Sequence, residues 1–242
     1  MKLTTLYDNV SMEPQSLIED WGFSLYIEKT HCSILFDTGA NGNVLLNNMQ
    51  ALSLHCPTRI FTSHLHYDHI GGLNAVLKNK KDETVVYYPY PVYNFREEAN
   101  VTHRVVKDVT EICPDVYSTG TLSFHSMINE QSLVLKEQYG LILIVGCSHP
   151  GIQNIVDFVV DKFGSNVFFL VGGFHLIGKS RWTVQRIARA LLLKVHYIAP
   201  SHCTGEPAKK IFKELFKERF VKNGVGQKIE INNGRLILKY EV

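Results

Sequence analysis

Apolar and polar residues alternate along this chain with two periods, one typical of β-strands and one typical of α-helices. In the first half, runs of apolar and β-branched residues predict a strand near residues 2–7, a hairpin over 23–37 and a strand over 85–88. A helix is predicted over 43–54. Residues 89–115 follow neither period, so no element is assigned to them.

The second half repeats the same kinds of element. Two strands between residues 122 and 149 precede a helix that begins after Gly151, and Ser180 is placed to cap the next helix. A third helix is predicted over 207–220, and a closing hairpin has the turn Asn232-Asn233-Gly234, which suits positive φ. The apolar stripes of the first two helices are Ile152, Ile155, Val156, Val159, Val160 and Phe163, then Val184, Ile187, Ala188, Leu191, Leu192 and Val195. Because no Pro/Gly/Ser linker divides the halves, we expect one domain over residues 1–242.

Four of the hydrophobic runs end in a histidine. The runs cover residues 60–64, 141–149, 167–175 and 197–202, and all are rich in the β-branched and aromatic residues that favour strands. Strand ends can converge on one rim of a fold, and imidazole and carboxylate are the usual ligands of zinc and its first-row neighbours. The pattern therefore predicts a metal-centred active site. The other histidines, His31, His55, His103, His125 and His196, are isolated and are expected to be surface or hydrogen-bonded side chains.

The first run continues into a dense group of metal-ligand side chains, His64-Leu65-His66-Tyr67-Asp68-His69. Because residues two apart in an extended segment face the same way, His64 and His66 can bind one ion together. If the chain turns into a helix near Asp68, then Asp68 and His69 point in different directions and can serve a second ion. Gly71-Gly72 would allow the backbone to approach closely there, and the helix N-terminus would favour an anionic group.

Composition and charge narrow the function. The 242 residues are 45% hydrophobic and 20% charged, which suits a compact domain. A formal net charge of +2 is too small to indicate nucleic acid or an anionic membrane as partner. No run approaches the roughly twenty apolar residues of a membrane span. The five cysteines are odd in number and form no C-x-x-C pair, so we expect reduced thiols in a cytoplasmic enzyme that acts on a small molecule. A homo-oligomer is left open.

The expected chemistry follows from a divalent cation in such a cluster. The ion would lower the pKa of bound water to roughly 7 and stabilise negative charge on a phosphoryl or carbonyl oxygen. Asp68 is then the candidate catalytic group that orients water or accepts a proton. Backbone N–H groups near Gly151 can bind phosphate oxygens, and Lys179 or Arg181 can contact a phosphorylated substrate. A phosphorylated or otherwise anionic small molecule is the expected substrate.

One segment carries a competing motif. Residues 173–180, Gly-Phe-His-Leu-Ile-Gly-Lys-Ser, satisfy the G-x-x-x-x-G-K-S pattern of a P-loop and lie between a predicted strand and a predicted helix. This alternative would make the protein a nucleotide-binding protein. Three observations oppose it: the variable positions are bulky where the backbone must wrap a phosphate, no Asp follows residue 161 to hold magnesium, and the histidine clusters would have no explanation.

Together these motifs resemble the metallo-β-lactamase superfamily. The resemblance is carried by Leu35-Phe36-Asp37-Thr38-Gly39, by the H-x-H-x-D-H motif of residues 64–69 and by the later histidines. It implies an α/β (α+β) fold, the four-layer αββα sandwich, with two divalent ions, zinc being favoured over manganese or iron. The implied ligands are His64, His66 and His149 for one ion and Asp68, His69 and His202 for the other, with Asp37 ordering the loop beneath them.

Further segments resemble one branch of that superfamily: Glu130-Gln131-Ser132-Leu133 and residues 146–152, 172–176 and 201–205. The branch includes archaeal synthases that join a dihydropterin to a ribofuranosyl-aminobenzene phosphate, so the resemblance leaves a metallo-hydrolase and a dihydropterin-type synthase open. The superfamily has a metal-bridging Asp where this chain has Gly173-Phe174-His175. His175 is therefore expected to contact either metal or substrate.

Two other functions remain as alternatives on the same fold. Di-iron oxidoreductases of the flavodiiron type generally have Glu in place of the second histidine of the motif, where this chain has His66. A metal-binding protein without turnover would keep the ligands and lose the activity.

Overall fold

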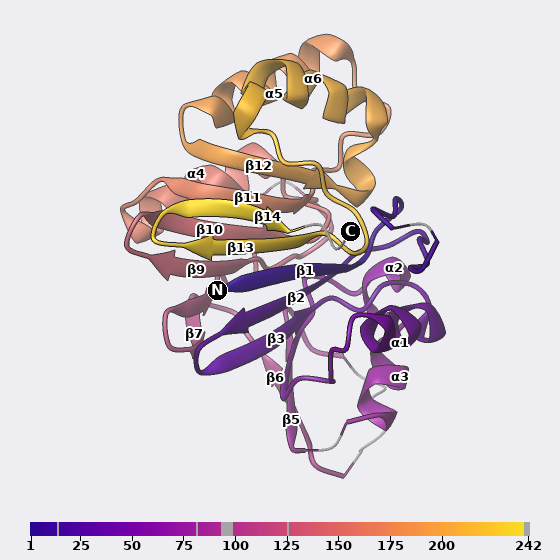
Figure 1. Ribbon diagram of the computed structural model, residues 1–242. Helices are drawn as coiled ribbons and strands as arrows, with labels where there is room; N and C mark the ends of the chain where they lie inside the picture. The colour runs from indigo at the N-terminus through magenta and orange to yellow at the C-terminus, as the bar shows by residue number, and fades with distance from the viewer. Residues whose placement is uncertain (14, 81, 93–98, 125, 240–242) are drawn as a thin grey trace. The chain divides into compact units, whose positions relative to one another are not determined.

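The computed structural model of the chain describes residues 1–242 except 14, 81, 93–98, 125 and 240–242. His125 and part of the unassigned stretch 89–115 therefore lie outside the described residues. The chain divides into two compact units: the first comprises Met1–Lys107 and Gly224–Val242, and the second comprises Asp108–Asn223. Each unit contains one β-sheet with its own helices (Figure 1). The expected single domain over residues 1–242 stays a prediction.

The described residues of the first unit form an eight-stranded sheet in the order β14-β13-β1-β2-β3-β4-β5-β6. Both ends of the sequence contribute, because β1 pairs antiparallel with β13 near the C-terminus (Figure 1). From β3 to β6 the strands run parallel, so the segments that follow β3 and β4 leave the same edge of the sheet. The strands are β1 (Lys2–Tyr7), β2 (Ser24–Lys29), β3 (Cys32–Phe36), β4 (Arg59–Phe61), β5 (Thr84–Tyr88), β6 (Val101–Val105), β13 (Lys228–Asn232) and β14 (Arg235–Lys239).

Three helices belong to the first unit: α1 (Gly42–Ala51), α2 (Tyr67–Ile70) and α3 (Leu73–Lys78). Asn41 caps α1, because its side chain accepts a hydrogen bond from the Asn43 N–H at 2.9 Å. Apolar residues of α1 and α3 pack with the sheet into one core that includes Leu45, Met49, Val76, Ile60 and Val86.

The helix predicted near Asp68 is divided in two at Gly71-Gly72. A Cβ atom would lie 2.1 Å from the Ala40 carbonyl oxygen at Gly71 and 2.3 Å from the Thr38 carbonyl oxygen at Gly72. No other residue type fits such distances without displacing backbone. The two glycines thus bring the end of α2 into close contact with the segment that follows β3, and the predicted backbone approach at a second ion stays a prediction.

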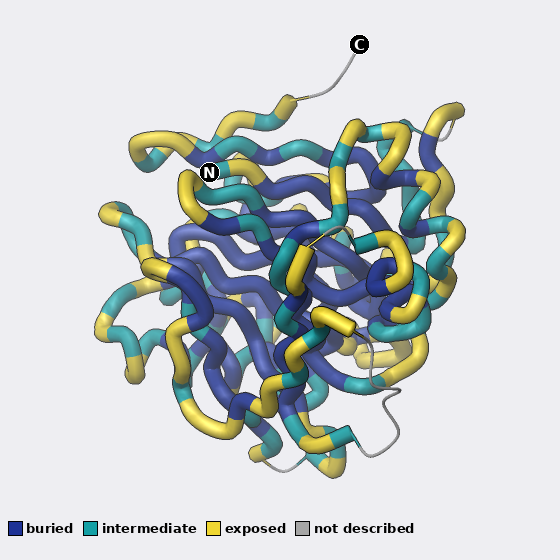
Figure 2. Tube along the Cα trace, turned by 90° about the horizontal axis from the view of Figure 1, so that it is seen from below, coloured by how far each residue is buried: buried dark blue, intermediate teal, exposed yellow. Residues whose placement is uncertain are grey.

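The described residues of the second unit form a six-stranded sheet in the order β12-β11-β10-β9-β8-β7. β10, β11 and β12 run parallel, so the three histidine-bearing segments that follow them start at the same edge. The strands are β7 (Thr110–Cys113), β8 (Val116–Ser118), β9 (Leu133–Glu137), β10 (Gly140–Val145), β11 (Val167–Gly173) and β12 (Val195–Ser201). In Figure 2 the strands of both sheets are largely dark blue, which marks buried residues.

The helices α4 (Ile152–Phe163), α5 (Arg181–Leu192) and α6 (Glu206–Phe216) pack with this second sheet into a separate core. Two short 3-10 helices, η1 (His202–Thr204) and η2 (Lys217–Arg219), complete the unit. The predicted apolar stripes form that core, with Ile155, Val159 and Ala188 fully buried. The predicted cap is confirmed, since the Ser180 side chain accepts from the Thr183 N–H at 3.2 Å.

Several local predictions are corrected. Val195 belongs to β12 rather than to the helix stripe, because α5 ends at Leu192. The unassigned stretch holds β6 and β7: the residues of β6 are half-buried or exposed, and β7 has two exposed residues followed by two buried ones, so neither strand shows a clear apolar alternation. No helix within the described residues is long and apolar enough to span a bilayer.

The cysteines do not all behave as expected. Cys32 and Cys113 are disulfide-bonded, whereas Cys56, Cys147 and Cys203 carry thiols. The expectation of five reduced thiols is wrong for two of them, because sequence spacing does not reveal which cysteines the fold brings near a partner. Disulfides are uncommon in cytosolic proteins, and the cytoplasmic location stays a prediction.

Candidate metal centre

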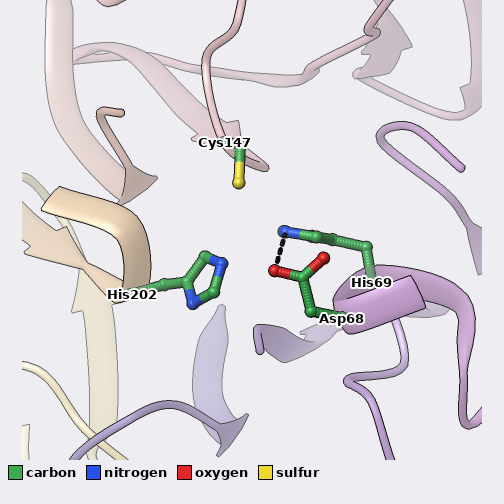
Figure 3. Close-up of side chains that lie close together, drawn as sticks. All are labelled: Asp68, His69, Cys147 and His202. Carbon is green, nitrogen blue, oxygen red and sulfur yellow. Dashed lines mark ion pairs between the residues drawn. The ribbon is translucent and has the colours of Figure 1, made fainter. Parts of the chain in front are cut away.

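In the first unit, the predicted ligands of the H-x-H-x-D-H motif form one cluster at the start of α2. The His64 ring centroid lies 4.6 Å from that of His66 and 4.2 Å from that of His69. His69 Nε2 is 3.8 Å from Asp68 Oδ2, the pair joined by the dashed line in Figure 3. His64 and His69 are fully buried, while His66 is exposed, so the cluster extends from the interior of the unit to its surface.

Hydrogen bonds to the Nδ1 atoms set the direction of two of these rings. Asp37 Oδ2 lies 2.7 Å from His69 Nδ1 and also accepts from the Ser63 hydroxyl at 2.7 Å. Because the Ser63 proton is used on Asp37, its oxygen accepts from His64 Nδ1–H at 2.9 Å. When Asp37 is ionised it can only accept, so both rings carry their proton on Nδ1 and present the Nε2 lone pair. This is the tautomer that a histidine ligand uses when it binds metal through Nε2.

Asp37 is placed for this task by its backbone. It directly follows β3, adopts a left-handed φ of 54°, and its other carboxylate oxygen accepts from the Ser63 N–H at 2.7 Å. The carboxyl group is completely buried. Burial raises the pKa of Asp37 above its ordinary value, and the contacts with His69 and Ser63 oppose that rise. A buried carboxyl group in a sparsely populated backbone conformation is a feature that clusters at functional sites.

In the second unit a buried glutamate, Glu130, orients a histidine ring as Asp37 does in the first. Glu130 Oε2 accepts from the His149 backbone N–H at 2.9 Å and lies 3.0 Å from His149 Nδ1. Glu130 Oε1 accepts from the Ser148 N–H at 2.9 Å. Burial raises the pKa of Glu130, but the hydrogen bonds from the His149 ring and from the two backbone N–H groups outweigh it, so the pKa lies below its ordinary value. Ionised Glu130 therefore holds His149 with its Nε2 lone pair outward.

Nitrogen and sulfur donors gather around His149. One ligand atom from each of Cys147, His149 and His175 lies within 4.8 Å of the other two, and the His149 and His175 ring centroids are 4.6 Å apart. A hydrogen bond with Cys203 is the main cause that raises the pKa of His175. His202 is buried at the start of η1, next to Cys203.

The thiol of Cys203 is polarised by these neighbours. Its pKa lies well below the ordinary value, chiefly because of a hydrogen bond with Cys147; burial opposes this, and His175 and His202 add to the lowering.

The loops that carry these side chains are conformationally demanding. Ser148, His175 and His202, one after each of the parallel strands, all have positive φ, at 62°, 52° and 44°. Each such residue costs roughly 1–2 kcal/mol relative to ordinary backbone. Hydrogen bonds between the loops offset that cost: Ser148 Oγ donates to the Gly173 carbonyl at 2.6 Å, and the Phe174 N–H donates to Thr204 Oγ1 at 3.1 Å.

The donor sets of both units fit a divalent first-row metal. The first supplies three imidazoles and a carboxylate, and the second supplies imidazoles with neighbouring thiols, all ligand types of zinc and its neighbours. Hydrogen-bonded Nδ1 atoms at His64, His69 and His149 supply the supporting contacts that such ligands need.

Other predicted residues lie elsewhere in the second unit. Lys179 and Arg181 line a cleft of about 640 Å³ between the starts of α5 and α6, where Arg181 pairs with Glu214 at 3.2 Å. Gly151 precedes α4 with φ 92°, and its own N–H donates to the Ser148 carbonyl at 2.8 Å. The Gly151 N–H therefore already has an acceptor within the fold, and phosphate binding near Gly151 stays a prediction.

The P-loop alternative is not supported by the loop that carries its motif. Four of its N–H groups are donated within the fold. Gly173 donates to the Gly146 carbonyl, Phe174 to Thr204 Oγ1, Leu176 to the Cys203 carbonyl and Lys179 to the Leu176 carbonyl. A P-loop uses such N–H groups to surround a phosphate. The segment instead packs Phe174 and Leu176 into the core of the unit.

Sequence reasoning missed Ser63 and the role of Glu130. Ser63 directly precedes the ligand His64, and a hydroxyl beside a candidate ligand is a weak signal that could have indicated it. Glu130 lies 19 residues before His149, and nothing in that spacing predicts the contact.

Comparison with known proteins supports the predicted resemblance. Residues 22–129 match the metallo-beta-lactamase superfamily domain. The crystal structure of Tm1679, described as a metal-dependent hydrolase of the beta-lactamase superfamily, superposes with a TM-score of 0.79 at 29% identity, covering 96% of this chain and 100% of that one. Residues 22–129 thus carry a metallo-beta-lactamase domain, and both the predicted fold and the predicted resemblance to this superfamily are confirmed.

Two relatives from Methanocaldococcus jannaschii are similar over most of the chain. The first, 7,8-dihydropterin-6-methyl-4-(beta-D-ribofuranosyl)-aminobenzene-5'-phosphate synthase, is 28% identical over 246 residues, which covers 81% of this chain and 84% of the synthase. The second, the uncharacterized protein MJ0448, is 29% identical over 245 residues, covering 87% of this chain and 93% of the relative. The resemblance to the synthase branch is thus also confirmed.

Proposed function

We propose that this protein is a metal-dependent enzyme that acts on a phosphorylated or otherwise anionic small molecule at a dinuclear centre. One ion is assigned to His64, His66 and His149, and the other to Asp68, His69 and His202. The observation that carries the proposal is a set of three hydrogen bonds. The Nδ1 atoms of His64, His69 and His149 each contact a buried hydroxyl or carboxylate group, which leaves Nε2 to bind an ion.

The chemistry at such a centre divides between the ions and the chain. Divalent ions held there would activate water at neutral pH and stabilise negative charge on a phosphoryl or carbonyl oxygen. Asp68, whose side chain is 19% exposed, can reach both ligand and solvent, and we assign it to orient water or accept a proton. His175, beside His149, is assigned to metal or substrate contact, and Lys179 and Arg181 to a substrate phosphate.

Two reactions fit this assignment. One is hydrolysis, the activity named for Tm1679, and the other is a transfer of the kind named for the Methanocaldococcus jannaschii synthase. Both need an anionic group held against cations, and both suit zinc, with manganese or iron as alternatives. His66, where flavodiiron-type enzymes generally have Glu, favours these two reactions over the flavodiiron one. A homo-oligomer stays open, and the molar mass in solution would decide it.

Metal analysis and a substrate panel test the proposal. The purified protein should contain up to two equivalents of divalent metal, and chelation should abolish turnover that returned zinc restores. The panel should contain phosphomonoesters, phosphodiesters, lactones and thioesters, together with a dihydropterin pyrophosphate supplied with an arylamine. Metal-dependent turnover of one class would separate hydrolase from synthase.

A matched pair of variants makes the test specific. His66→Ala should lose metal and turnover, whereas His31→Ala, an exposed histidine in the turn between β2 and β3, should keep both. Full activity of metal-free His66→Ala would overturn the proposal. Iron instead of zinc, with oxygen consumption, would support the flavodiiron alternative.

A further inference from the structure

Asp68 is held in place by a segment far away in the sequence. The indole Nε1–H of Trp21 donates to Asp68 Oδ2 at 3.0 Å, and the Phe23 N–H donates to the Asp68 carbonyl oxygen at 3.2 Å. Between them, a Cβ atom at Gly22 would lie 2.5 Å from that same carbonyl oxygen. The segment therefore contacts both the side chain and the backbone of one candidate ligand.

Trp21 is itself anchored to the end of β1. Asp20 accepts from the Trp21 backbone N–H at 2.8 Å through one carboxylate oxygen and from the Tyr7 hydroxyl through the other. Burial raises the pKa of Tyr7, with a further contribution from Asp20, so the phenol stays protonated and donates. The same phenolic oxygen accepts from the Asn41 N–H at 3.0 Å. Hydrogen bonds on the backbone and on the side chain of Trp21 thus connect the buried Tyr7, through Asp20, with the carboxylate of Asp68.

Core packing does not explain this tryptophan. The side chain is 50% exposed, so a large part of the indole surface is not buried by its position. In this position the indole N–H donates to the Asp68 carboxylate, and this hydrogen bond limits the rotation of the Asp68 side chain. A ligand with a fixed orientation loses less conformational entropy when an ion binds.

We propose that Trp21 is a positioning residue for Asp68: its indole N–H fixes the carboxylate in the orientation that binds an ion. This inference rests on the proposed function, because the ion is what Asp68 would hold. It adds a residue outside the histidine motif and, through Asp20 and Tyr7, links the ligand to the first strand of the sheet.

Tryptophan fluorescence tests the contact without disturbing it. The chain has two tryptophans, Trp21 and Trp182, and Trp182 lies 71% exposed on α5. The Trp182→Phe protein therefore emits from Trp21 alone, and the Trp21→Phe protein is its matched control. Zinc added to metal-free Trp182→Phe should change the emission saturably, and cobalt should quench it. Trp21→Phe should respond much less. Unchanged Trp21 emission while metal analysis shows bound ions would overturn the inference.

Metal affinity supplies the second readout. Trp21→Phe keeps an aromatic ring and lacks the N–H donor, so the zinc dissociation constant of one of the two equivalents should rise by about tenfold, the lower end of the effect of removing a ligand's supporting hydrogen bond. Trp182→Phe should keep the wild-type value. In an Asp68→Asn background the change at Trp21 should have little further effect, since the two residues act through one contact.

The possible outcomes distinguish a failure of the Trp21 proposal from a failure of the proposed function. Wild-type affinity in a folded Trp21→Phe protein overturns this inference and leaves the proposed function standing. A wild-type protein that binds no divalent ion overturns both. Circular dichroism and thermal unfolding of the metal-free variants establish folding, and if Trp21→Phe does not fold, the emission of Trp182→Phe decides.

Discussion

Replacing Glu130 by Gln changes a single group on a buried side chain and should disable His149. The glutamate accepts three hydrogen bonds, from the N–H groups of Ser148 and His149 and from the His149 ring, at 2.9–3.0 Å. Glutamine has one oxygen and one NH₂ group, so whichever way it turns, at least one buried N–H group faces another donor. An unsatisfied buried donor costs about 1–3 kcal/mol, and losing hydrogen bonds to a charged acceptor adds to it.

The expected loss of stability from Glu130→Gln is therefore roughly 2–4 kcal/mol, which for a chain of this length lowers the melting temperature by about 4–15 °C. Zinc affinity should also fall, by about 10–100-fold, because a neutral amide, even with its oxygen toward His149, holds the Nδ1 proton less firmly than the charged carboxylate does. Urea unfolding of the metal-free protein measures the first quantity and competition with a chelator dye measures the second. Glu218→Gln, an exposed glutamate in η2, is the control and should change neither.

The pH dependence of the same contact has a definite sign. The folded-state pKa of Glu130 lies below its ordinary value of 4.5, so the unfolded chain binds the proton more readily than the folded one. Its contribution to stability is fully present above the unfolded pKa and is lost as the pH falls through the folded pKa. The stability difference between wild type and Glu130→Gln should thus be constant near neutral pH and shrink in acid. Equal stability of the two proteins at pH 7, or unchanged zinc affinity, would refute the reasoning.

Three further substitutions test separate parts of the structure. Asp37→Asn should weaken zinc binding by about 10–100-fold in a chelator competition, because an amide nitrogen facing His69 Nδ1 forces the ring into the other tautomer; wild-type affinity would contradict this. Gly72→Ala should destabilise the protein by roughly 1–3 kcal/mol in urea unfolding, since its Cβ would lie 2.3 Å from the Thr38 carbonyl oxygen. Ser180→Ala should lose about 1 kcal/mol through the missing α5 cap, with metal content unchanged; a loss of metal would show that this helix start also supports the centre.

The sequence predicted the strand ends and the motif ligands because these depend on local patterns. β-branched runs predict strands, and a histidine that directly follows such a run must lie at the strand's end, as His202 does after β12. Helix stripes are similarly local, and α4 begins one residue after Gly151 as expected.

What the sequence did not predict depends on contacts between distant segments. Glu130 lies 19 residues from His149, and Trp21 lies 47 residues from Asp68. Only the strand order brings these pairs together, and no residue period reports strand order. The helix prediction was wrong at Val195 for a related reason. An apolar residue at helical spacing can also belong to a buried strand, and the pairing of Val195 with Val167 places it in β12.

Each unit contains a buried acid that contacts the Nδ1 atom of a histidine, but the pKa values of the two acids are shifted in opposite directions. In each, parallel strands deliver histidines to a common edge, and a fully buried acid on another segment holds one ring by Nδ1. Glu130 accepts from two backbone N–H groups as well as the ring, and its pKa is lowered; Asp37 accepts from one backbone N–H, the ring and the Ser63 hydroxyl, and its pKa is raised. The difference follows from how far fixed donors compensate for the loss of water around each carboxylate. The ring held by Glu130 therefore has the more strongly fixed proton, and the ring held by Asp37 depends more on whatever positive charge is bound beside it.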